Sequence, residues 1–399
     1  MQKVSIAIVG QGYVGLPLAV EAAKANFKVI GIDNDLNRVL QINSGVSPVE
    51  GINSNELKVL LKSGVYSASQ NYELIKGASI VLICVPTPLN EIGEPDLSLV
   101  INATENIAKN ISKGTLIILE SSVAPGTTRN IVFETIRKFS GLGAEEFKVA
   151  FSPERIDPLN KTWNLQNTPK IIAGLTESAK NEAKNFYSSF VKNVFVCQTV
   201  EIAETAKLLE NSFRLINISF INELAIYCNS IGVPVSEVIK AASTKPYGFM
   251  AFTPSSGAGG HCIPVDPVYL ANSARINGTP IEMIEIAAQI NTKMTSYYIS
   301  QASNRIGSLA GKKILIIGIS YKPNISDLRE SAGIKLIQSL REKGSEVFWH
   351  DELAKKWLDE KSTPISNGYD LAILVTPHDH LNLSALENVP IIDTRGFNR

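Results

Sequence analysis

Short, almost continuously apolar runs alternate with helix-like segments in the first third of the chain. The runs with the composition of strands buried on both faces are Val4–Val9, Lys28–Ile32, Ile80–Val85, Thr115–Leu119 and Lys148–Phe151. Segments with helical spacing lie between them, at Leu18–Asn26, Leu97–Asn110 and Arg129–Phe139. This alternation predicts a doubly wound α/β domain with a parallel sheet, which Lys170–Ala173 and Val194–Cys197 extend or edge.

From about residue 200 the pattern changes to long helical segments. They are expected at Glu201–Ser230, which holds neither Gly nor Pro, at Ser236–Ala242, and from about Ile281 to Arg305. Between the last two, Tyr247–Pro267 is rich in Gly, Pro and Ser and too irregular for either a helix or a strand. A loop of that length inside a compact domain is usually functional.

The α/β pattern returns in the last quarter of the chain. Strand-like runs occur there at Lys313–Ile319, Glu346–Trp349, Leu371–Val375 and Pro390–Ile392. The predicted fold class is therefore α/β, with two Rossmann-like doubly wound domains joined by a central helical domain with a long helix. The predicted domains cover residues 1–199, 200–305 and 306–399.

Composition and charge narrow the function classes. Lys+Arg and Asp+Glu are both 38, so the net charge is zero, which argues against a nucleic-acid partner. The four cysteines include no CxxC pair and the histidines form no HExxH motif, so neither a disulfide framework nor a metal site is expected. No apolar run reaches the roughly 18 residues of a membrane helix, and no signal peptide is recognisable, so we expect a cytoplasmic protein.

A glycine-rich turn follows the first predicted strand. Gly10, Gly12 and Gly15 form a GxGxxG pattern between strand and helix, and Asp33 ends the next strand 18 residues later. Such glycines let the backbone approach a pyrophosphate, and the acid accepts from the ribose hydroxyls and repels a 2′-phosphate. The pattern predicts an NAD site; FAD, or a glycine turn that binds no cofactor, is the alternative.

A second glycine-rich segment leads into a cysteine. Gly257, Gly259 and Gly260 precede Cys262, and Asp266 follows four residues later. Glycines before a thiol let a substrate approach it closely, so Cys262 is a candidate nucleophile. A buried structural cysteine is the alternative.

Seven motifs, taken together and in order, identify a family. They are GQGYVGLP (10–17), VPTP (85–88), SSVAPGTT (121–128), SPERIDP (152–158), AKLLENSFR (206–214), GAGGHCIPVDP (257–267) and YKPNISDLRES (321–331). Over essentially all 399 residues the chain resembles the UDP-glucose/GDP-mannose dehydrogenase family. The resemblance implies a four-electron oxidation of C6 of a nucleotide sugar, from alcohol to carboxylate, with two NAD. It also implies that the first domain binds NAD and the last binds the UDP-sugar.

Catalytic roles follow from the resemblance and agree with the residue chemistry. Lys207 and Asn211 are four residues apart on one helix, so they face the same way and suit the stabilisation of an oxyanion. The family's catalytic positions correspond to Cys262 as nucleophile, Lys207, Asn211, Asp266 in proton transfer, Glu154 beside the hydrolytic water, and Ser122, where UDP-glucose enzymes carry Thr.

The resemblance also implies binding residues. For NAD they are Gly10, Gly12, Tyr13, Val14, Gly15, Asp33, Arg38, Pro86, Thr87, Ser122 and Arg329. For the UDP-sugar they are Glu154, Arg155, Lys207, Asn211, Thr253, Gly257, Gly259, Lys322 and Arg395. A Lys and an Arg are suited to a diphosphate because each donates charge-assisted hydrogen bonds.

The sequence leans toward one branch of the family. The SPERIDP motif, the PVDPVYL run (264–270) and NELA (222–225) are similar to UDP-N-acetylhexosamine 6-dehydrogenases, with UDP-N-acetylglucosamine the expected substrate and surface polysaccharide synthesis the implied pathway. UDP-N-acetylmannosamine and UDP-glucose are the alternatives. The family's P-G-P-G loop here reads PSSG (254–257), a departure in the substrate wall.

Rival classes are a two-electron 2-hydroxy-acid dehydrogenase and a non-catalytic nucleotide-sugar binding protein. A homodimer formed through the central helices is expected.

Overall fold

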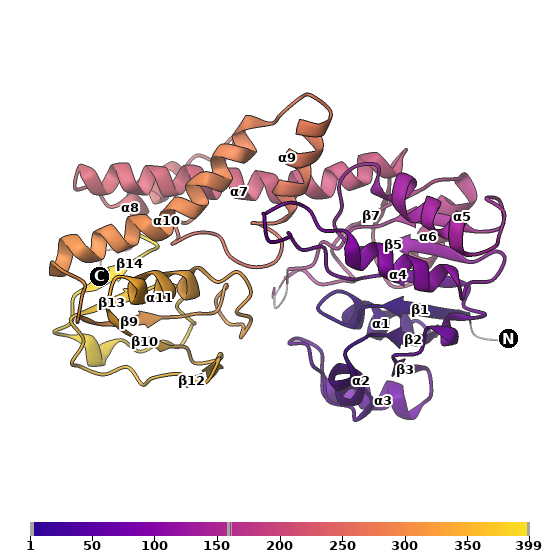
Figure 1. Cartoon of the computed structure of the whole chain (residues 1–399), viewed down its shortest axis with the longest axis horizontal. Helices are drawn as coiled ribbons and strands as arrows, with labels where there is room; N and C mark the ends of the chain where they lie inside the picture. The colour runs from indigo at the N-terminus through magenta and orange to yellow at the C-terminus, as the bar shows by residue number, and fades with distance from the viewer. Residues whose placement is uncertain (1–3, 158–159, 161, 397–399) are drawn as a thin grey trace. The chain divides into compact units, whose positions relative to one another are not determined.

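The chain folds into two compact units that meet in sequence after Leu209 (Figure 1). The computed structural model describes residues 4–157, 160 and 162–396.

The first unit is built on an eight-stranded sheet. Its strands are β1 (Ser5–Val9), β2 (Lys28–Ile32), β3 (Tyr66–Ser69), β4 (Ile80–Ile83), β5 (Leu116–Leu119), β6 (Lys148–Phe151), β7 (Lys170–Gly174) and β8 (Val194–Val196). They lie in the order β3-β2-β1-β4-β5-β6-β7-β8, and every neighbouring pair is parallel except β6 and β7. The first six strands follow the Rossmann order, in which ligands bind beyond the carboxyl ends of the strands.

Both faces of this sheet are covered. The helices are α1 (Gly15–Lys24), α2 (Leu36–Asn43), α3 (Ser54–Lys62), α4 (Ser98–Ala108), α5 (Glu134–Phe139) and α6 (Glu177–Ser188), with short segments η1 (Tyr72–Ile75) and η2 (Thr128–Phe133), the latter π-helical. Ile6 and Ile8 belong to one buried cluster, whereas Ala7 and Val9 belong to the other. Alternate residues of a strand face opposite sides, so an uninterrupted apolar run is needed where both sides are buried.

The second unit combines long helices with a smaller sheet. Its helices are α7 (Val200–Ser230), which begins in the first unit, α8 (Val235–Ala242), α9 (Asp266–Ile276), α10 (Glu282–Ile306) and α11 (Ala332–Glu342), with η3 (Ser384–Leu386). The parallel sheet has the order β10-β9-β13-β14, from β9 (Lys313–Ile317), β10 (Glu346–His350), β13 (Leu371–Leu374) and β14 (Ile391–Asp393). A separate antiparallel pair joins β11 (Lys356–Trp357) and β12 (Glu360–Lys361).

The predicted α/β class, with two Rossmann-like sheets and a helical middle, is confirmed. The irregular segment ends slightly earlier than predicted, because α9 begins at Asp266 and Pro267 fits within its first turn. The domain boundaries at 199/200 and 305/306 stay a prediction.

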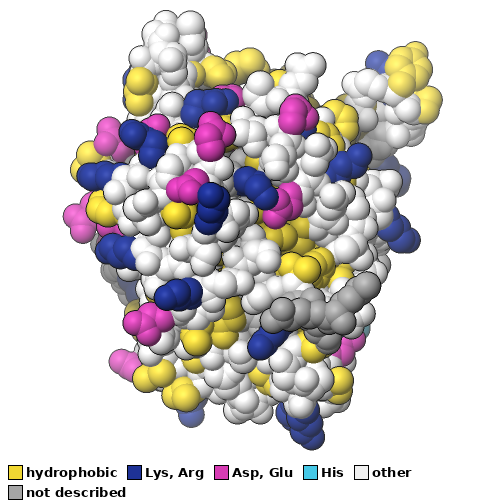
Figure 2. Space-filling view, turned by 90° about the vertical axis from the view of Figure 1, so that its right-hand side faces the viewer, with side chains coloured by type: hydrophobic (Ala, Val, Ile, Leu, Met, Phe, Trp, Pro, Cys, Tyr) yellow, Lys and Arg dark blue, Asp and Glu magenta, His cyan; other side chains and the backbone are white. Residues whose placement is uncertain are grey.

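The structure also bears on membrane crossing, surface charge and disulfide bonding. Within the described residues no helix is both long and apolar enough to cross a membrane. On the face drawn in Figure 2, basic and acidic side chains are interspersed and form no patch of one sign. The four cysteines, all within the described part of the chain, form no disulfide.

Candidate functional site

The glycine turn after β1 has the geometry of a phosphate cradle. Gly10 has φ +91°, and a Cβ on it would lie 2.6 Å from the Cys84 carbonyl oxygen. A Cβ on Gly15 would lie 1.8 Å from the Gly10 carbonyl oxygen, whereas around Gly12 a Cβ would meet nothing within 4 Å. Helix α1 starts here without a side-chain cap, so its first N–H groups suit an anion. These residues therefore fit the NAD pyrophosphate.

Asp33 ties the end of β2 to this turn. Its side chain is almost fully buried, and its Oδ2 accepts hydrogen bonds from the Gln11 backbone N–H (2.7 Å) and from Arg38 Nη1 (3.1 Å). Oδ1 accepts from the Asp35 N–H (2.9 Å). Asp33 thus organises the turn and holds Arg38 next to the position expected for the adenosine ribose. Tyr13 is half-buried beside the same turn.

The Asp33–Arg38 pair predicts the choice between NAD and NADP. In Asp33→Asn the shape is kept, the charge that repels a 2′-phosphate is lost, and Arg38 is released to meet that phosphate. We expect the ratio of kcat/KM for NADP over NAD to rise about tenfold or more, since one charge-assisted hydrogen bond contributes about 1.5–3 kcal/mol. Initial rates with both cofactors measure this ratio. An unchanged ratio in the folded variant would contradict the assignment.

Two loops at the carboxyl ends of β4 and β5 carry the next predicted residues. Ser121 Oγ donates to the Val85 carbonyl oxygen (2.6 Å), so the two loops are joined. In them Pro86 is exposed, Thr87 is buried and Ser122 is half-buried. The structure therefore brings these three residues to the sheet edge where a doubly wound domain binds its dinucleotide.

A buried glutamate that sequence reasoning missed holds the second of these loops. Glu204 of α7 accepts from the Gly126 N–H (2.6 Å), the Thr128 N–H (2.8 Å) and Thr128 Oγ1 (2.6 Å). Burial raises the pKa of Glu204 to about 7, although these three donors act in the opposite direction. The residue therefore links α7 to the loop that carries Ser122.

Glu204 predicts a pH-dependent stability. Its pKa in the folded protein is raised above the ordinary value of 4.5, so the folded state binds the proton more tightly than the unfolded state does. The resulting contribution to folding stability is fully present below pH 4.5 and is lost as the pH rises through about 7. Between pH 5.5 and 8 the wild type is expected to lose about 2 kcal/mol of unfolding free energy relative to Glu204→Gln, which cannot titrate. Urea unfolding of both proteins across this range measures the difference. Two curves that run parallel with pH would contradict it.

The loop after β6 carries Glu154 and Arg155. Arg155 Nη1 donates to the Pro169 carbonyl oxygen (2.6 Å), so this guanidinium contacts the backbone of its own unit. Glu154 is half-buried, and its Oε1 accepts from the Ile156 N–H. Both lie beyond the carboxyl end of their strand, and their contacts with substrate stay a prediction.

In the second unit the structure joins three of the predicted catalytic residues. Asn211 Nδ2 donates to Asp266 Oδ2 at 2.6 Å, and both side chains are buried. The Asp266 N–H donates to the Cys262 carbonyl oxygen (2.9 Å), which places the exposed Cys262 one turn before Asp266 at the start of α9. Lys207, also buried, lies one helical turn before Asn211, in the part of α7 that belongs to the first unit.

Two asparagines that the sequence analysis did not single out hold residues 247–265, the substrate loop. Asn222 Oδ1, on α7, accepts from the Ser255 N–H (2.8 Å). Asn291, on α10, accepts from the Ala258 N–H (2.6 Å) and donates to its carbonyl oxygen (3.2 Å). Asn222 is fully buried, and such a polar residue within a long helix is a signal that could have been used. In this loop Thr253 is exposed, and Gly257 has φ +121°.

The substrate loop packs on the loop after β9 through glycines. A Cβ on Gly259 would lie 2.7 Å from the Glu330 carbonyl oxygen, and one on Gly260 would lie 2.8 Å from the Tyr321 ring. The Gly260 N–H donates to the Arg329 carbonyl oxygen (3.2 Å). The Arg329 side chain is half-exposed and forms an ion pair with Asp327 (2.5 Å).

The two cations expected on the UDP diphosphate lie on braced loops. Asp351 accepts from the Ser320 N–H (3.0 Å) and from His378, while the Asn324 N–H donates to His378 Nδ1 (2.9 Å). Lys322 lies between these anchors. Burial alone would raise the pKa of Asp351, but the hydrogen bond from His378 and several backbone N–H groups hold it well below its usual range. Arg395 follows β14, and its N–H donates to Asp393 (2.9 Å).

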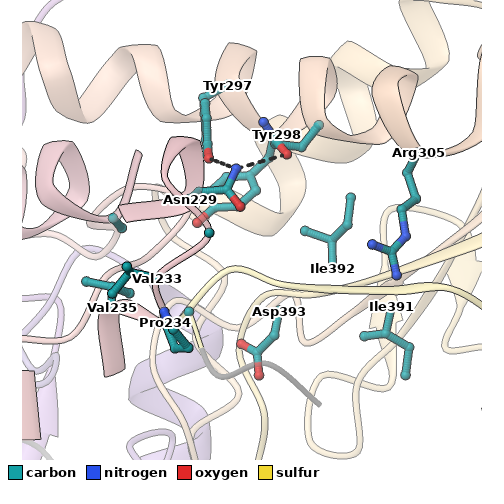
Figure 3. Close-up of a pocket in the computed structure, with 14 residues that line it drawn as sticks. Asn229, Val233, Pro234, Val235, Tyr297, Tyr298, Arg305, Ile391, Ile392 and Asp393 are labelled. Carbon is teal, nitrogen blue, oxygen red and sulfur yellow. Dashed lines mark hydrogen bonds between the residues drawn. The ribbon is translucent and has the colours of Figure 1, made fainter. Parts of the chain in front are cut away.

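A cavity of about 440 Å³ in the second unit lies near Arg395 (Figure 3). Its wall includes Asp393 and Gly396, on either side of that residue in sequence. Figure 3 shows Asn229, which donates to the Tyr297 hydroxyl (3.1 Å), on its wall. None of the predicted site residues lines this cavity.

Comparison with known proteins gives matches along most of the chain. Three family models match, all of the UDP-glucose/GDP-mannose dehydrogenase family: its NAD binding domain over residues 4–191, its central domain over 201–293 and its UDP binding domain over 315–398.

Individual relatives carry more specific names. A UDP-N-acetyl-D-glucosamine 6-dehydrogenase of Pseudomonas aeruginosa is 33% identical over 98% of the chain and 94% of that protein. A UDP-N-acetyl-D-mannosamine dehydrogenase of Pyrococcus horikoshii is also 33% identical, over 94% of the chain and 89% of that protein. The solved structure of a UDP-D-ManNAc dehydrogenase from Pyrococcus horikoshii has a TM-score of 0.91 at 32% identity, covering 99% of this chain and 96% of that one.

Proposed function

Since the chain belongs to the UDP-glucose/GDP-mannose dehydrogenase family and is an NAD-dependent nucleotide-sugar dehydrogenase, we propose that it oxidises C6 of a UDP-N-acetylhexosamine to the uronate. We take UDP-N-acetylglucosamine as the substrate, in keeping with the Pseudomonas relative. UDP-N-acetylmannosamine is the second candidate, because the Pyrococcus relative is as similar in sequence. The observation that carries the proposal is the contact of Asn211 with Asp266, one turn after Cys262.

The first oxidation converts the C6 alcohol to an aldehyde. The residues around Gly10, Gly12 and Asp33 would hold NAD, which would supply the hydride acceptor for both oxidations. Lys207 and Asn211 stabilise the negative charge that develops on the C6 oxygen, Lys207 by its charge and Asn211 by a hydrogen bond. Asp266 takes part in moving the alcohol proton.

The second oxidation needs a tetrahedral carbon. The Cys262 thiolate adds to the aldehyde and forms a thiohemiacetal, whose oxidation gives a thioester. Hydrolysis then releases the uronate and regenerates the thiolate, with Glu154 accepting a proton from the attacking water. A 2-hydroxy-acid dehydrogenase needs no thiol, and a binding protein needs none of these groups.

A panel of substrates tests the proposal. UDP-GlcNAc, UDP-ManNAc, UDP-GalNAc, UDP-Glc and GDP-Man are each incubated with enzyme and NAD, and NADH and uronate are measured. Two NADH per sugar with UDP-GlcNAc alone supports the full proposal. Turnover of UDP-ManNAc alone replaces the substrate but keeps the reaction, and no NADH with any UDP-sugar overturns it.

We also propose a homodimer that forms through α7 in a cytoplasmic enzyme. Phe213, Phe220 and Tyr227 are 44%, 61% and 59% exposed, and their spacing of seven residues places them along one face of α7. Ile231, which is 53% exposed, follows directly after the helix. An exposed apolar stripe of this kind is typical of a surface that another protein covers. Its length along a single helix suits the same helix of a second copy.

The dimer predicts a defined molar mass. Light scattering is expected to give twice the 43.3 kDa of one chain for the wild type. Placing carboxylates in the stripe with Phe220→Glu and Tyr227→Glu is expected to give 43.3 kDa, because buried unpaired charges oppose association. The exposed Leu353→Glu serves as a control outside the stripe and is expected to remain dimeric. A monomeric wild type would contradict the proposal.

A further inference from the structure

The first unit contains a buried charged cluster that the mechanism above does not use. Lys170, the first residue of β7, is 3% exposed, and its Nζ lies 2.5 Å from Glu120 Oε2. Glu120 follows β5 and is 1% exposed, and its other oxygen accepts from the hydroxyl of Tyr187, which is fully buried on α6. An ion pair so deeply buried costs desolvation free energy, so its presence calls for a reason.

The same lysine faces the carboxylate assigned to the hydrolytic water. Lys170 Nζ donates to the carbonyl oxygen of Pro153 (3.0 Å), the residue before Glu154, and lies 3.9 Å from Glu154 Oε2. That oxygen is buried and accepts no hydrogen bond from any described residue. An ammonium group has three donors. Two of those on Lys170 are used by Glu120 and Pro153, and the third can serve Glu154.

The groups that face Lys170 fix its charge. They are Glu120 beyond β5, Glu154 beyond β6, Tyr187 on α6 and Cys84 beyond β4. Burial disfavours the ammonium, but the two carboxylates outweigh this effect and raise the pKa of Lys170. Burial likewise raises the pKa of Tyr187 and of Cys84, so both stay protonated. Lys170 is therefore the one cation of this cluster.

We propose that Lys170, held by Glu120 and Tyr187, is a positioning residue that orients the Glu154 carboxylate for thioester hydrolysis. This inference rests on the proposed function. In that step the water oxygen bonds to the thioester carbon, Glu154 takes one water proton, and the carbon–sulfur bond breaks to leave the Cys262 thiolate. No electrons are transferred in this step, so a defect in it leaves both preceding oxidations intact.

The test replaces Lys170 and Glu120 together, so that neither is left as an unpaired buried charge. Lys170→Met with Glu120→Gln removes both charges and keeps the approximate shape, and Lys170→Arg keeps the cation. The matched control is Lys148→Met with Glu182→Gln, another Lys–Glu pair of the same unit, whose side chains are 28% and 31% exposed. Tyr187→Phe removes a single hydroxyl from the same cluster. If the double variant fails to fold, this milder variant is expected to lower the steady-state rate in its place.

Rapid-mixing kinetics separate oxidation from hydrolysis. The double variant is expected to release two NADH per site in its first turnover at nearly the wild-type rate, while steady-state kcat falls about 30-fold or more. Intact mass spectrometry during turnover should then show the sugar nucleotide attached to Cys262. Lys170→Arg should recover most of the rate, and Tyr187→Phe should lose about threefold.

Specific outcomes would overturn the inference. A folded double variant with unchanged kcat and no sugar nucleotide attached to Cys262 during turnover rules out a role for Lys170 in hydrolysis. If the rate of NADH release in the first turnover falls as much as the steady-state kcat, the double variant has a general structural defect, and this result also overturns the inference. A wild-type enzyme that releases no NADH with any UDP-sugar overturns the proposed function, and this inference with it.

Discussion

Cys262→Ser is expected to lower uronate formation at least 1,000-fold while the variant stays folded. Because Cys262 is exposed, its sulfur contributes little to the packing of the fold. The loss of activity in the variant therefore reflects the missing thiol and not a loss of stability. A serine hydroxyl is not ionised at neutral pH and makes a poor adduct with the aldehyde, so no thioester forms. The first hydride transfer needs no thiol, and the variant should release at most one NADH per sugar. Product analysis with NADH counting measures both quantities.

Cys228→Ser is the control for this experiment. Cys228 lies on α7 and is 3% exposed, so its replacement changes a thiol without touching the proposed chemistry. It is expected to keep two NADH per sugar, with some loss of thermal stability from a buried hydroxyl. Full uronate production by Cys262→Ser at the wild-type rate would refute covalent catalysis by this residue.

Asp266→Asn is expected to lower kcat about 1,000-fold with little change in stability. The Asn211 amide donates to Asp266 Oδ2 at 2.6 Å, and an asparagine carbonyl oxygen can accept the same hydrogen bond. Packing and the start of α9 are thus kept, while the carboxylate that moves a proton is lost. Removing a positioned acid or base commonly costs 10²- to 10⁴-fold in rate. The pH profile of kcat and the melting temperature test the two halves of this prediction.

Asp370→Asn provides the matched control for that experiment. Asp370 is partly exposed and pairs with Lys312 (3.0 Å) just before the amino ends of β13 and β9, the two central strands of the smaller sheet. Its replacement removes one carboxylate from the same unit and should change kcat by less than about twofold, since exposed ion pairs contribute little. If Asp266→Asn also kept kcat within twofold, Asp266 would have no part in proton transfer.

Much of the fold could be predicted from apolar periodicity alone. The strands expected at Lys28–Ile32 and Lys148–Phe151 agree with the structure at both ends, because runs buried on both faces are distinct from their surroundings. Apolar periodicity predicts no element between Leu36 and Ser69, where the structure has α2, α3 and the edge strand β3. In β3 (Tyr66–Ser69) small and polar residues alternate with buried ones, so it has no apolar run to detect.

The parts of the candidate site that consist of residues close together in sequence could be predicted from motifs. The glycine turn and the Cys262–Asp266 spacing are local in sequence, and their geometry is as expected. Glu204 and Lys170 were missed because their partners lie 76 and 50 residues away, and a single polar residue within a helix or strand leaves no periodic signal. Asn211 and Asp266 are 55 residues apart, and the family resemblance implies a catalytic role for each but predicts no contact between them.

The division of the chain within α7 limits how this protein can be cut. The two units meet between Leu209 and Glu210, so the break falls in one continuous helix, between Lys207 and Asn211. A gene split at this point would give one fragment that ends with the first part of α7 and another that begins with the rest of α7. Short isolated helices are barely stable in water. Fragment complementation is therefore expected to succeed with a cut in a loop, such as the one after α10, and to fail with a cut at the unit boundary.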